Sequence, residues 1–443
     1  MSLGISMRDS LGEVVVPEGV LYGPHTARAL RNFAVPGPRL CDHPEFVHAL
    51  VTVKIAAARA NAALGTLDPA IADAITEAGA EVLAGRHLRH FVLPVVQGGG
   101  GTSTNMNVNE VLARRATEIL RGRGNGHESL EIHPNDHVNR GQSTNDVMPT
   151  AIGIAVYRAA GRAVDGLRHL CDVLNAKADE YTGLVHLGRT CLQDAVPIPV
   201  SAVHRAQAHA IAEASTDLAD VAERLLAVPL GGTAVGTGIG AADGFGAHAV
   251  RILAEATDLP VRPAKDPHHA LASLEPLAHV TEAMSRSGRT IARVATDLRL
   301  LASGPHGGIA EVLLPGVQSG SSIMPGKVNP VIPELVMQTA FQLAGAATTA
   351  HLAVSAGELE VSPMAPVVTL GLLTGLPALA ETARIFADRC VAGLCWDREA
   401  VARHLRGSLA PAVNSATTEG YEAAARAAYA RPAANLDHIA KGA

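Results

Sequence analysis

Long stretches of helical periodicity dominate the chain from residue 145 onward and limit the folds open to it. In the first stretch, aliphatic residues such as Leu167, Leu170 and Leu174 recur every three or four positions, with charged residues between them. Similar stretches cover residues 201–228, 271–302, 333–355 and 367–393. Helices of about 25 residues are roughly 40 Å long. We therefore expect a mostly α-helical protein built around a bundle of five long helices.

Composition supports this prediction and adds to it. Hydrophobic residues make up 48% of the chain, but aromatic residues only 3%. That balance suits helices packed closely through small residues, and it is unusual for a sheet-rich protein. The apolar faces of the helices are wider than one protomer would bury, which predicts a homo-oligomer.

Charge and cysteine content argue against several classes of protein. The net charge of -6 offers no broad attraction to nucleic acid or to an anionic membrane. The 5 cysteines are scattered without CxxC pairs, which favours a reduced intracellular protein over a disulfide framework. None of the 20 histidines has HExxH spacing, so no metal site is predicted. We found neither a secretory signal pattern nor an uninterrupted apolar run of roughly 20 residues, and predict a cytoplasmic protein.

The pattern along the chain suggests three parts. Residues 1–142 mix short apolar runs with turns and predict an N-terminal domain of helices plus a short hairpin. Residues 143–396 would form the five-helix bundle domain. Residues 397–443 would form a small, shortened C-terminal helical domain.

Polar segments interrupt the helical plan and carry candidate chemistry. Residues 320–330, GSSIMPGKVNP, place two hydroxyls, a lysine and a carboxamide on one loop, a composition suited to binding carboxylates. Residues 97–107, QGGGGTSTNMN, lack the GK[ST] of a P-loop, and a flexible linker is the alternative there. In QSTND, residues 142–146, Ser143 and Thr144 stand where the first long helix should begin. They could cap the helix, or its free N–H groups could bind a carboxylate.

Together with HPNDHVN at 133–139 and GRTCLQDAVP at 188–197, these segments resemble the ordered signature blocks of the aspartase/fumarase superfamily. The resemblance covers residues 8–425 and is stronger to aspartate ammonia-lyases than to fumarate hydratases. It implies a mostly α, three-domain protomer whose long helices form the central bundle of a homotetramer. It also implies active sites shared among three subunits, a C4 dicarboxylate substrate and no organic cofactor.

The resemblance assigns a role to most of the candidate residues. Ser321 would be the general base that removes the C3 proton. That step puts a second negative charge on the neighbouring carboxylate, which then needs hydrogen-bond donors aimed at it. The donors would be Thr102, Ser143, Thr144 and Ser322. Lys327 and Asn329 would hold the other carboxylate, with Thr190 assisting.

Position 191 departs from the family pattern. Relatives carry His or Gln there, whereas this chain has Cys191, and the acidic partner expected for that His, Glu334, is retained. A thiol beside a carboxylate is a poor acid–base relay, which weighs against hydration of fumarate. Asn145 then becomes the better candidate for recognising a substrate amine. A plain alternative is that Cys191 is simply a small buried residue.

Three histidines complete the candidate set. His133 resembles the residue of a secondary carboxylate site in fumarases, although a structural role is favoured. His25 and His306 stand where the family usually has Gln and Arg, and no role is assigned to them.

These observations leave several functions open. The first hypothesis is an aspartate ammonia-lyase. The second is a specialised lyase that releases fumarate from an N-substituted aspartate or nitrosuccinate. The third is a class II fumarate hydratase, and the fourth is a non-catalytic structural protein on the same scaffold.

Overall fold

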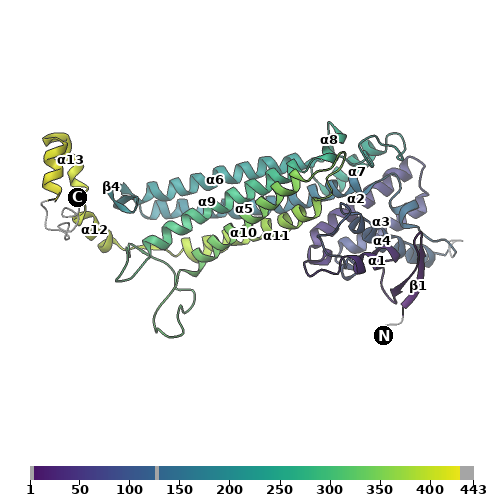
Figure 1. The fold of residues 1–443 in the computed structure, drawn as a ribbon, viewed down its shortest axis with the longest axis horizontal. Helices are drawn as coiled ribbons and strands as arrows, with labels where there is room; N and C mark the ends of the chain where they lie inside the picture. Colours follow the sequence, from purple (N-terminus) through teal and green to yellow (C-terminus); the bar gives the residue numbers. More distant parts are fainter. Residues whose placement is uncertain (1–3, 125–128, 430–443) are drawn as a thin grey trace. The chain divides into compact units, whose positions relative to one another are not determined.

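Long helices dominate the computed structural model, which describes residues 4–124 and 129–429. The last residues of the predicted C-terminal domain, 430–443, lie outside this part, as do residues 1–3 and 125–128 of the predicted N-terminal domain. The five predicted long helices are all present (Figure 1): α5 (Thr144–Glu180), α6 (Val200–Glu223), α9 (Glu275–Leu301), α10 (Val331–Ser355) and α11 (Ala365–Phe386). The prediction of a mostly α fold with a bundle of long helices is confirmed.

Small residues let these helices approach closely, as the composition predicts. A Cβ atom at Gly166 of α5 would lie 2.6 Å from the carbonyl oxygen of Ala380 of α11, so only glycine fits there. The hydroxyls of Thr339 on α10 and Thr382 on α11 are buried and lie 3.2 Å apart. These two helix contacts therefore depend on short side chains.

Contacts within the chain define two compact units. The first comprises residues up to 163 with 217–286 and 341–378, and the second comprises 164–216, 287–340 and 379 onward. The long helices run through both units, so this division differs in kind from a division by sequence pattern. The three domains 1–142, 143–396 and 397–443 stay a prediction.

The first unit contains the expected N-terminal hairpin and short helices. Strands β1 (Gly4–Asp9) and β2 (Gly12–Pro17) pair antiparallel. They are followed by α1 (Pro24–Asn32), α2 (Pro44–Ala63), α3 (Pro69–Leu83) and α4 (Thr102–Gly122). The helix α2 is apolar on nearly all sides and buried along most of its length, as expected of a core helix. Helices α7 (Phe245–Thr257) and α8 (Pro267–Ala272) also belong to this unit.

The second unit contains a longer hairpin and the C-terminal helices. Strands β3 (Val185–Thr190) and β4 (Gln193–Pro199) pair antiparallel, and β7 (Val312–Leu313) pairs with β8 (Cys395–Trp396). Trp396 donates from Nε1 to Nε2 of His204 at 3.1 Å and so attaches β8 to α6. Three short helices follow: α12 (Arg398–Gly407), α13 (Pro411–Glu419) and α14 (Tyr421–Tyr429).

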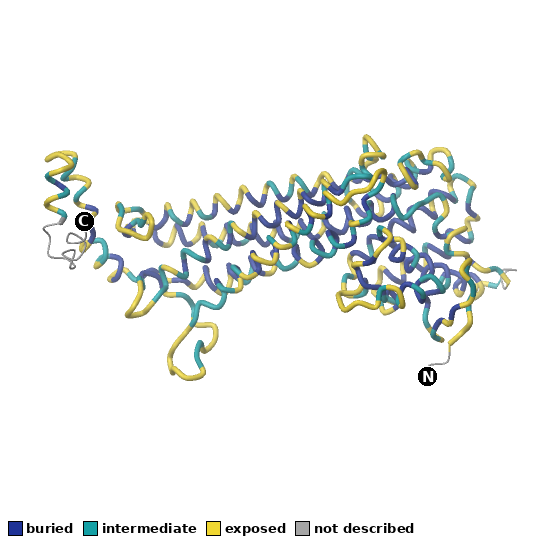
Figure 2. The backbone as a smooth tube through the Cα atoms, viewed as in Figure 1, coloured by how far each residue is buried: buried dark blue, intermediate teal, exposed yellow. Residues whose placement is uncertain are grey.

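One described helical stretch, Ala365–Val391, is long and apolar enough to cross a membrane by length and composition alone, which the sequence analysis did not anticipate. However, 56% of its most apolar window is buried inside the structure. Figure 2 shows buried and exposed positions alternating along the bundle helices. This pattern is typical of a core helix in a bundle.

Candidate active site

The start of α5 is fixed by reciprocal hydrogen bonds between its own residues. The Ser143 hydroxyl oxygen accepts from the Asn145 N–H at 3.2 Å, and Asp146 Oδ1 accepts from the Ser143 N–H at 2.9 Å. Such reciprocal bonds satisfy N–H groups that the first turn of a helix leaves unpaired. The capping role predicted for Ser143 is therefore confirmed. Its hydroxyl proton can still be donated to a ligand.

Asp146 ties this helix start to a distant turn. Its side chain is fully buried, and Oδ2 accepts from the backbone N–H groups of Gly231 and Thr233, both at 3.0 Å. Burial raises the pKa of Asp146 to about 6, against the opposing effect of its backbone donors. Asn145 is held from the same side, because its Nδ2 donates to the Ala234 carbonyl at 2.8 Å. Its carboxamide oxygen has no partner among the described residues and could accept from an amine.

The glycine-rich segment is a turn into α4 rather than a flexible linker. Gly99, Gly100 and Gly101 adopt φ values of 85°, 63° and 95°, which favour glycine, and Thr102 is the first residue of α4. Thr102 is exposed there. One turn further along α4, Asn105 Nδ2 donates to the Thr144 hydroxyl oxygen at 3.3 Å. The first turns of α4 and α5 therefore meet, and each presents the positive end of its helix dipole.

A buried polar network that the sequence analysis missed lies next to this helix junction. Asn139 Oδ1 accepts from Lys54 Nζ at 2.8 Å and from the side-chain nitrogens of Asn105 and Asn109, both at 3.1 Å. Lys54 is fully buried on α2, and burial lowers its pKa to about 7. The sequence analysis used HPNDHVN, which contains Asn139, only for the family resemblance and did not predict its contact with Lys54.

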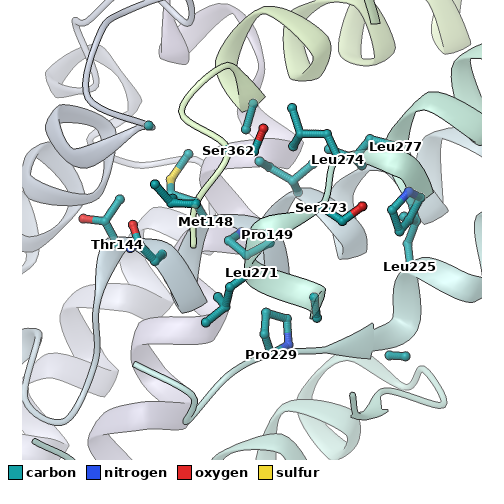
Figure 3. A pocket seen from close by; sticks show the side chains of 18 of the residues that line it. Thr144, Met148, Pro149, Leu225, Pro229, Leu271, Ser273, Leu274, Leu277 and Ser362 are labelled. Atoms are coloured by element: carbon teal, nitrogen blue, oxygen red, sulfur yellow. The ribbon is translucent and has the colours of Figure 1, made fainter. Parts of the chain in front are cut away.

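A cavity adjoins the start of α5 within the first unit. Figure 3 shows Thr144, Met148 and Pro149 of α5 on one side of it, with Leu271 and Leu274 nearby. Most of its lining is apolar. The polar start of α5 therefore has an apolar flank, a combination common in small-molecule sites.

His133 caps a short helical turn and does not lie in this junction. Its Nδ1 accepts from the N–H groups of Asn135 and Asp136 at 3.3 Å and 3.1 Å. This contact agrees with the favoured structural role. A role of His133 in a secondary carboxylate site stays a prediction.

The β3–β4 hairpin places two further candidates at its tip. Thr190 pairs with Gln193, so Cys191 and Leu192 form a two-residue turn with φ values of 52° and 61°. Such turns favour Asn or Gly because both central residues need positive φ. Cys191 is exposed, so the alternative of a small buried residue is wrong for this chain.

The strand before this tip has a buried anchor. Arg189 forms a bidentate pair with Glu311, with contacts of 3.0 Å and 2.7 Å. His404 of α12 contacts the same carboxylate at 2.7 Å. Burial alone would raise the pKa of Glu311, but the nearby His186 and the hydrogen bonds from Arg189 and His404 outweigh it and lower the pKa to about 2.

Residues 320–330 form an exposed loop closed by its own hydrogen bonds. The Gly320 N–H donates to the Lys327 carbonyl at 2.9 Å, and Asn329 Nδ2 donates to the Gly320 carbonyl at 2.8 Å. A Cβ atom at Gly320 would lie 2.7 Å from the Asn329 nitrogen, so the closure requires glycine. Ser322 and Lys327 are exposed on this loop.

Ser321 is held in a specific way within the loop. Its hydroxyl oxygen accepts from the backbone N–H groups of Ile323 at 3.2 Å and Met324 at 2.8 Å. Two N–H donors aimed at one oxygen stabilise negative charge on it. The local geometry therefore favours an alkoxide at Ser321 more than an ordinary exposed serine would.

Glu334 lies beside this loop but has a different partner from the one expected. Lys327, Asn329 and Glu334 line one groove of the second unit. Glu334 pairs with Arg299 of α9 at 3.4 Å. No hydrogen bond joins Glu334 to Cys191 among the residues that the structure describes.

The candidates thus fall into two sets. The first unit holds Thr102, His133, Ser143, Thr144 and Asn145, and the second holds Thr190, Cys191, Ser321, Ser322, Lys327, Asn329 and Glu334. Within the first unit the structure brings together the residues of the helix junction. Within the second unit it brings together the loop and the groove beside it.

Comparison with known proteins identifies the class of protein to which these segments belong. A lyase family model matches residues 12–345. Aspartate ammonia-lyase of Escherichia coli strain K12 is 40% identical over 405 residues, which cover 90% of this chain and 84% of the relative. Fumarate hydratase class II of Methylorubrum extorquens is 40% identical over 421 residues, covering 95% and 88%. The solved fumarate lyase:delta crystallin of Brucella melitensis has a TM-score of 0.91 at 36% identity, covering 99% of this chain and 94% of that one.

The chain belongs to the aspartase/fumarase superfamily. It is a lyase, and the matched region contains every candidate residue. Relatives of two different activities have the same identity of 40%, so overall similarity does not select the reaction.

Two departures of this superfamily member can now be placed. His25 Nε2 lies 3.2 Å from the Ser103 hydroxyl, next to Thr102 at the start of α4. His306 is exposed on the turn after α9. His25 therefore adjoins the helix junction, and nothing in the structure assigns a role to His306.

Proposed function

We propose that this lyase is an aspartate ammonia-lyase, which converts L-aspartate to fumarate and ammonia. The observation that carries the proposal concerns Cys191 and Glu334, which stand where the family pattern has a His–Glu pair. Cys191 supplies no imidazole, and Glu334 pairs with Arg299 at 3.4 Å. A hydratase needs a relay that activates water, whereas a protonated amine can leave with less help.

The proposed reaction begins at Ser321. Its alkoxide, stabilised by the N–H groups of Ile323 and Met324, takes the C3 proton of aspartate. The electron pair left on C3 is delocalised into the neighbouring carboxylate, which becomes a dianion. Hydroxyl donors at the starts of α4 and α5, from Thr102, Ser143 and Thr144, would stabilise it together with Ser322.

The second step breaks the C–N bond. The electron pair returns from the carboxylate to form the C2–C3 double bond, and the protonated amine leaves as ammonia. Asn145 would receive the amine through its carboxamide oxygen. Lys327 and Asn329 would hold the other carboxylate, with Thr190 assisting, and Ser321 would return its proton to solvent.

We further propose that the active protein is a homotetramer with shared sites. One chain carries the donor set at and before the start of α5 and the proposed base loop well after this helix, in different compact units. Helix α10 also leaves large apolar side chains exposed, with Phe341 at 67% and Leu352 at 68%. Exposed apolar surface on a bundle helix supports packing against another copy.

The first test is substrate choice, followed by the absorbance of fumarate. We expect turnover of L-aspartate to exceed that of L-malate, nitrosuccinate and N-substituted aspartates. Malate turnover equal to that of aspartate would instead favour the class II hydratase. A preference for nitrosuccinate or a substituted aspartate would favour the specialised lyase, for which His25 beside the helix junction is the supporting observation.

A substitution tests the role of position 191 directly. Cys191→His restores an imidazole at the exposed hairpin tip, and we expect higher activity on aspartate or new hydration of fumarate. Cys191→Ser is the matched control, because it keeps the size and supplies no relay. Equal activity of all three proteins on both substrates would remove position 191 from the site.

A further inference from the structure

Lys54 is a buried lysine that the proposed mechanism does not use. It lies on α2 with no exposed surface, and Nζ donates to Asn139 Oδ1 at 2.8 Å and Gln142 Oε1 at 2.9 Å. A buried amine is costly even when it is hydrogen-bonded, and an apolar side chain of similar size is often as stable or more so. The contacts of Lys54 therefore suggest a role beyond stability.

The lysine determines which way the neighbouring amides face. An ammonium group donates only, so it requires the oxygens of Asn139 and Gln142 to point toward it. The neutral amine also has the two N–H groups that these contacts need. With its oxygen facing Lys54, Asn139 can receive only donors at that atom, and Asn105 and Asn109 both present their side-chain nitrogens to it at 3.1 Å.

The orientation of Asn139 in turn fixes which atoms donate and accept between Asn105 and Thr144. Asn105 Nδ2 carries two hydrogens, and it contacts Thr144 Oγ1 at 3.3 Å in addition to Asn139. The Thr144 oxygen accepts from Asn105, so its single proton is directed away from the network. Thr144 is the first residue of α5, where that proton is available to a ligand.

We infer that Lys54 is a positioning residue that, through Asn139 and Asn105, sets the Thr144 hydroxyl as a donor toward the ligand carboxylate. The inference rests on the proposed function only in requiring a C4 dicarboxylate at this site. Fumarate is common to all three candidate reactions, so the inference does not depend on the leaving group.

The test is a double-mutant cycle on the dissociation constant of fumarate, measured by calorimetry. The proteins are wild type, Lys54→Met, Thr144→Val and the double variant. We expect Lys54→Met alone to weaken binding about tenfold, but less than about twofold when Thr144 is already Val. An equal loss in both backgrounds would show general damage and overturn the inference.

A second pair of variants applies if Lys54→Met does not fold. Asn105→Asp places an acceptor where Thr144 now meets a donor, so it should draw the hydroxyl proton into the protein. Asn105→Ala only removes the donor. We expect Asp to bind fumarate more weakly than Ala, and the difference to vanish in the Thr144→Val background. A difference that persists would reflect charge alone and contradict the inference.

Asn61→Ala is the matched control. Asn61 is also buried on α2 and donates to the Arg140 carbonyl at 2.9 Å, and none of its hydrogen bonds among the described residues goes to Lys54, Asn139 or Asn105. It should lower stability and leave fumarate binding unchanged within about twofold. Failure of the wild-type protein to bind fumarate would overturn both the proposed function and this inference, whereas binding without coupling would overturn only the inference.

Discussion

The start of α5 and the loop at residues 320–330 are both proposed to bind the same diacid, yet they are held in opposite ways. The α5 start is braced by buried groups, including fully buried Asp146 and Lys54. The loop is exposed and is closed by bonds among its own residues, such as Gly320 to Lys327. One half of the site is thus preorganised in the single chain. The other half carries the proposed base, which a ligand or another protomer would have to shield from water.

The largest effect should come from the exposed half without any loss of stability. Ser321→Ala removes the proposed base, and we expect kcat to fall about 10³-fold or more. The unfolding free energy should stay within about 0.5 kcal/mol of wild type, because Ser321 is not in the core. Steady-state kinetics and urea denaturation measure the two quantities. Retained turnover would remove Ser321 from its role.

The α5 start should instead lose stability when one of its buried groups is removed. Asp146→Ala leaves the backbone N–H groups of Ser143, Gly231 and Thr233 without their acceptor, and we expect a loss of about 3 kcal/mol or more in unfolding free energy. Asp297→Ala is the control, because it removes only a surface pair with Arg293 and should cost less than about 0.5 kcal/mol. Equal losses in both variants would contradict the comparison.

The buried pair of Arg189 and Glu311 behind the hairpin tip should make the unfolding free energy depend on pH in the acid range. The pKa of Glu311 is lowered from 4.5 to about 2 in the folded protein. Its stabilisation is therefore present above about pH 4.5 and is lost as the pH falls toward 2, by about 3 kcal/mol in total. Glu311→Gln should be less stable at neutral pH and lose less between pH 5 and pH 3. Parallel pH profiles of unfolding free energy would rule out this anchor.

The smallest effect concerns the exposed lysine of the loop. Lys327→Met should raise KM for aspartate about tenfold and leave unfolding free energy unchanged, because Lys327 is exposed and is proposed to meet only the ligand. Lys265→Met, at another exposed lysine, is the control. A large drop in stability for Lys327→Met would mean that the loop is braced as the α5 start is.

The comparison also explains what could be predicted from the sequence. Helix bounds followed from periodicity, since residues 271–302 were predicted and α9 covers Glu275–Leu301. The candidate segments followed from short strings of polar residues. The bonds of Asp146 to Gly231 and Thr233 could not, because they join residues 85 and 87 positions apart.

Other features depended on packing that no local pattern records. In the sequence, Lys54 is a single charge within an apolar helix, and only the structure shows that Asn139 lies beside it. The exposure of Cys191 was missed because its turn lacks the Asn or Gly that usually marks positive φ. The pairing of Glu334 with Arg299 likewise needed the arrangement of α9 and α10.

Subunit complementation tests the central claim most directly. One variant carries Ser143→Ala and Thr144→Val, the other carries Ser321→Ala, and each alone should have almost no turnover. If the two halves of a site come from different protomers, dissociating and reassembling an equal mixture should restore about a quarter of wild-type activity, because random mixing leaves that share of sites intact. Activity no greater than the sum of the separate variants would contradict the account.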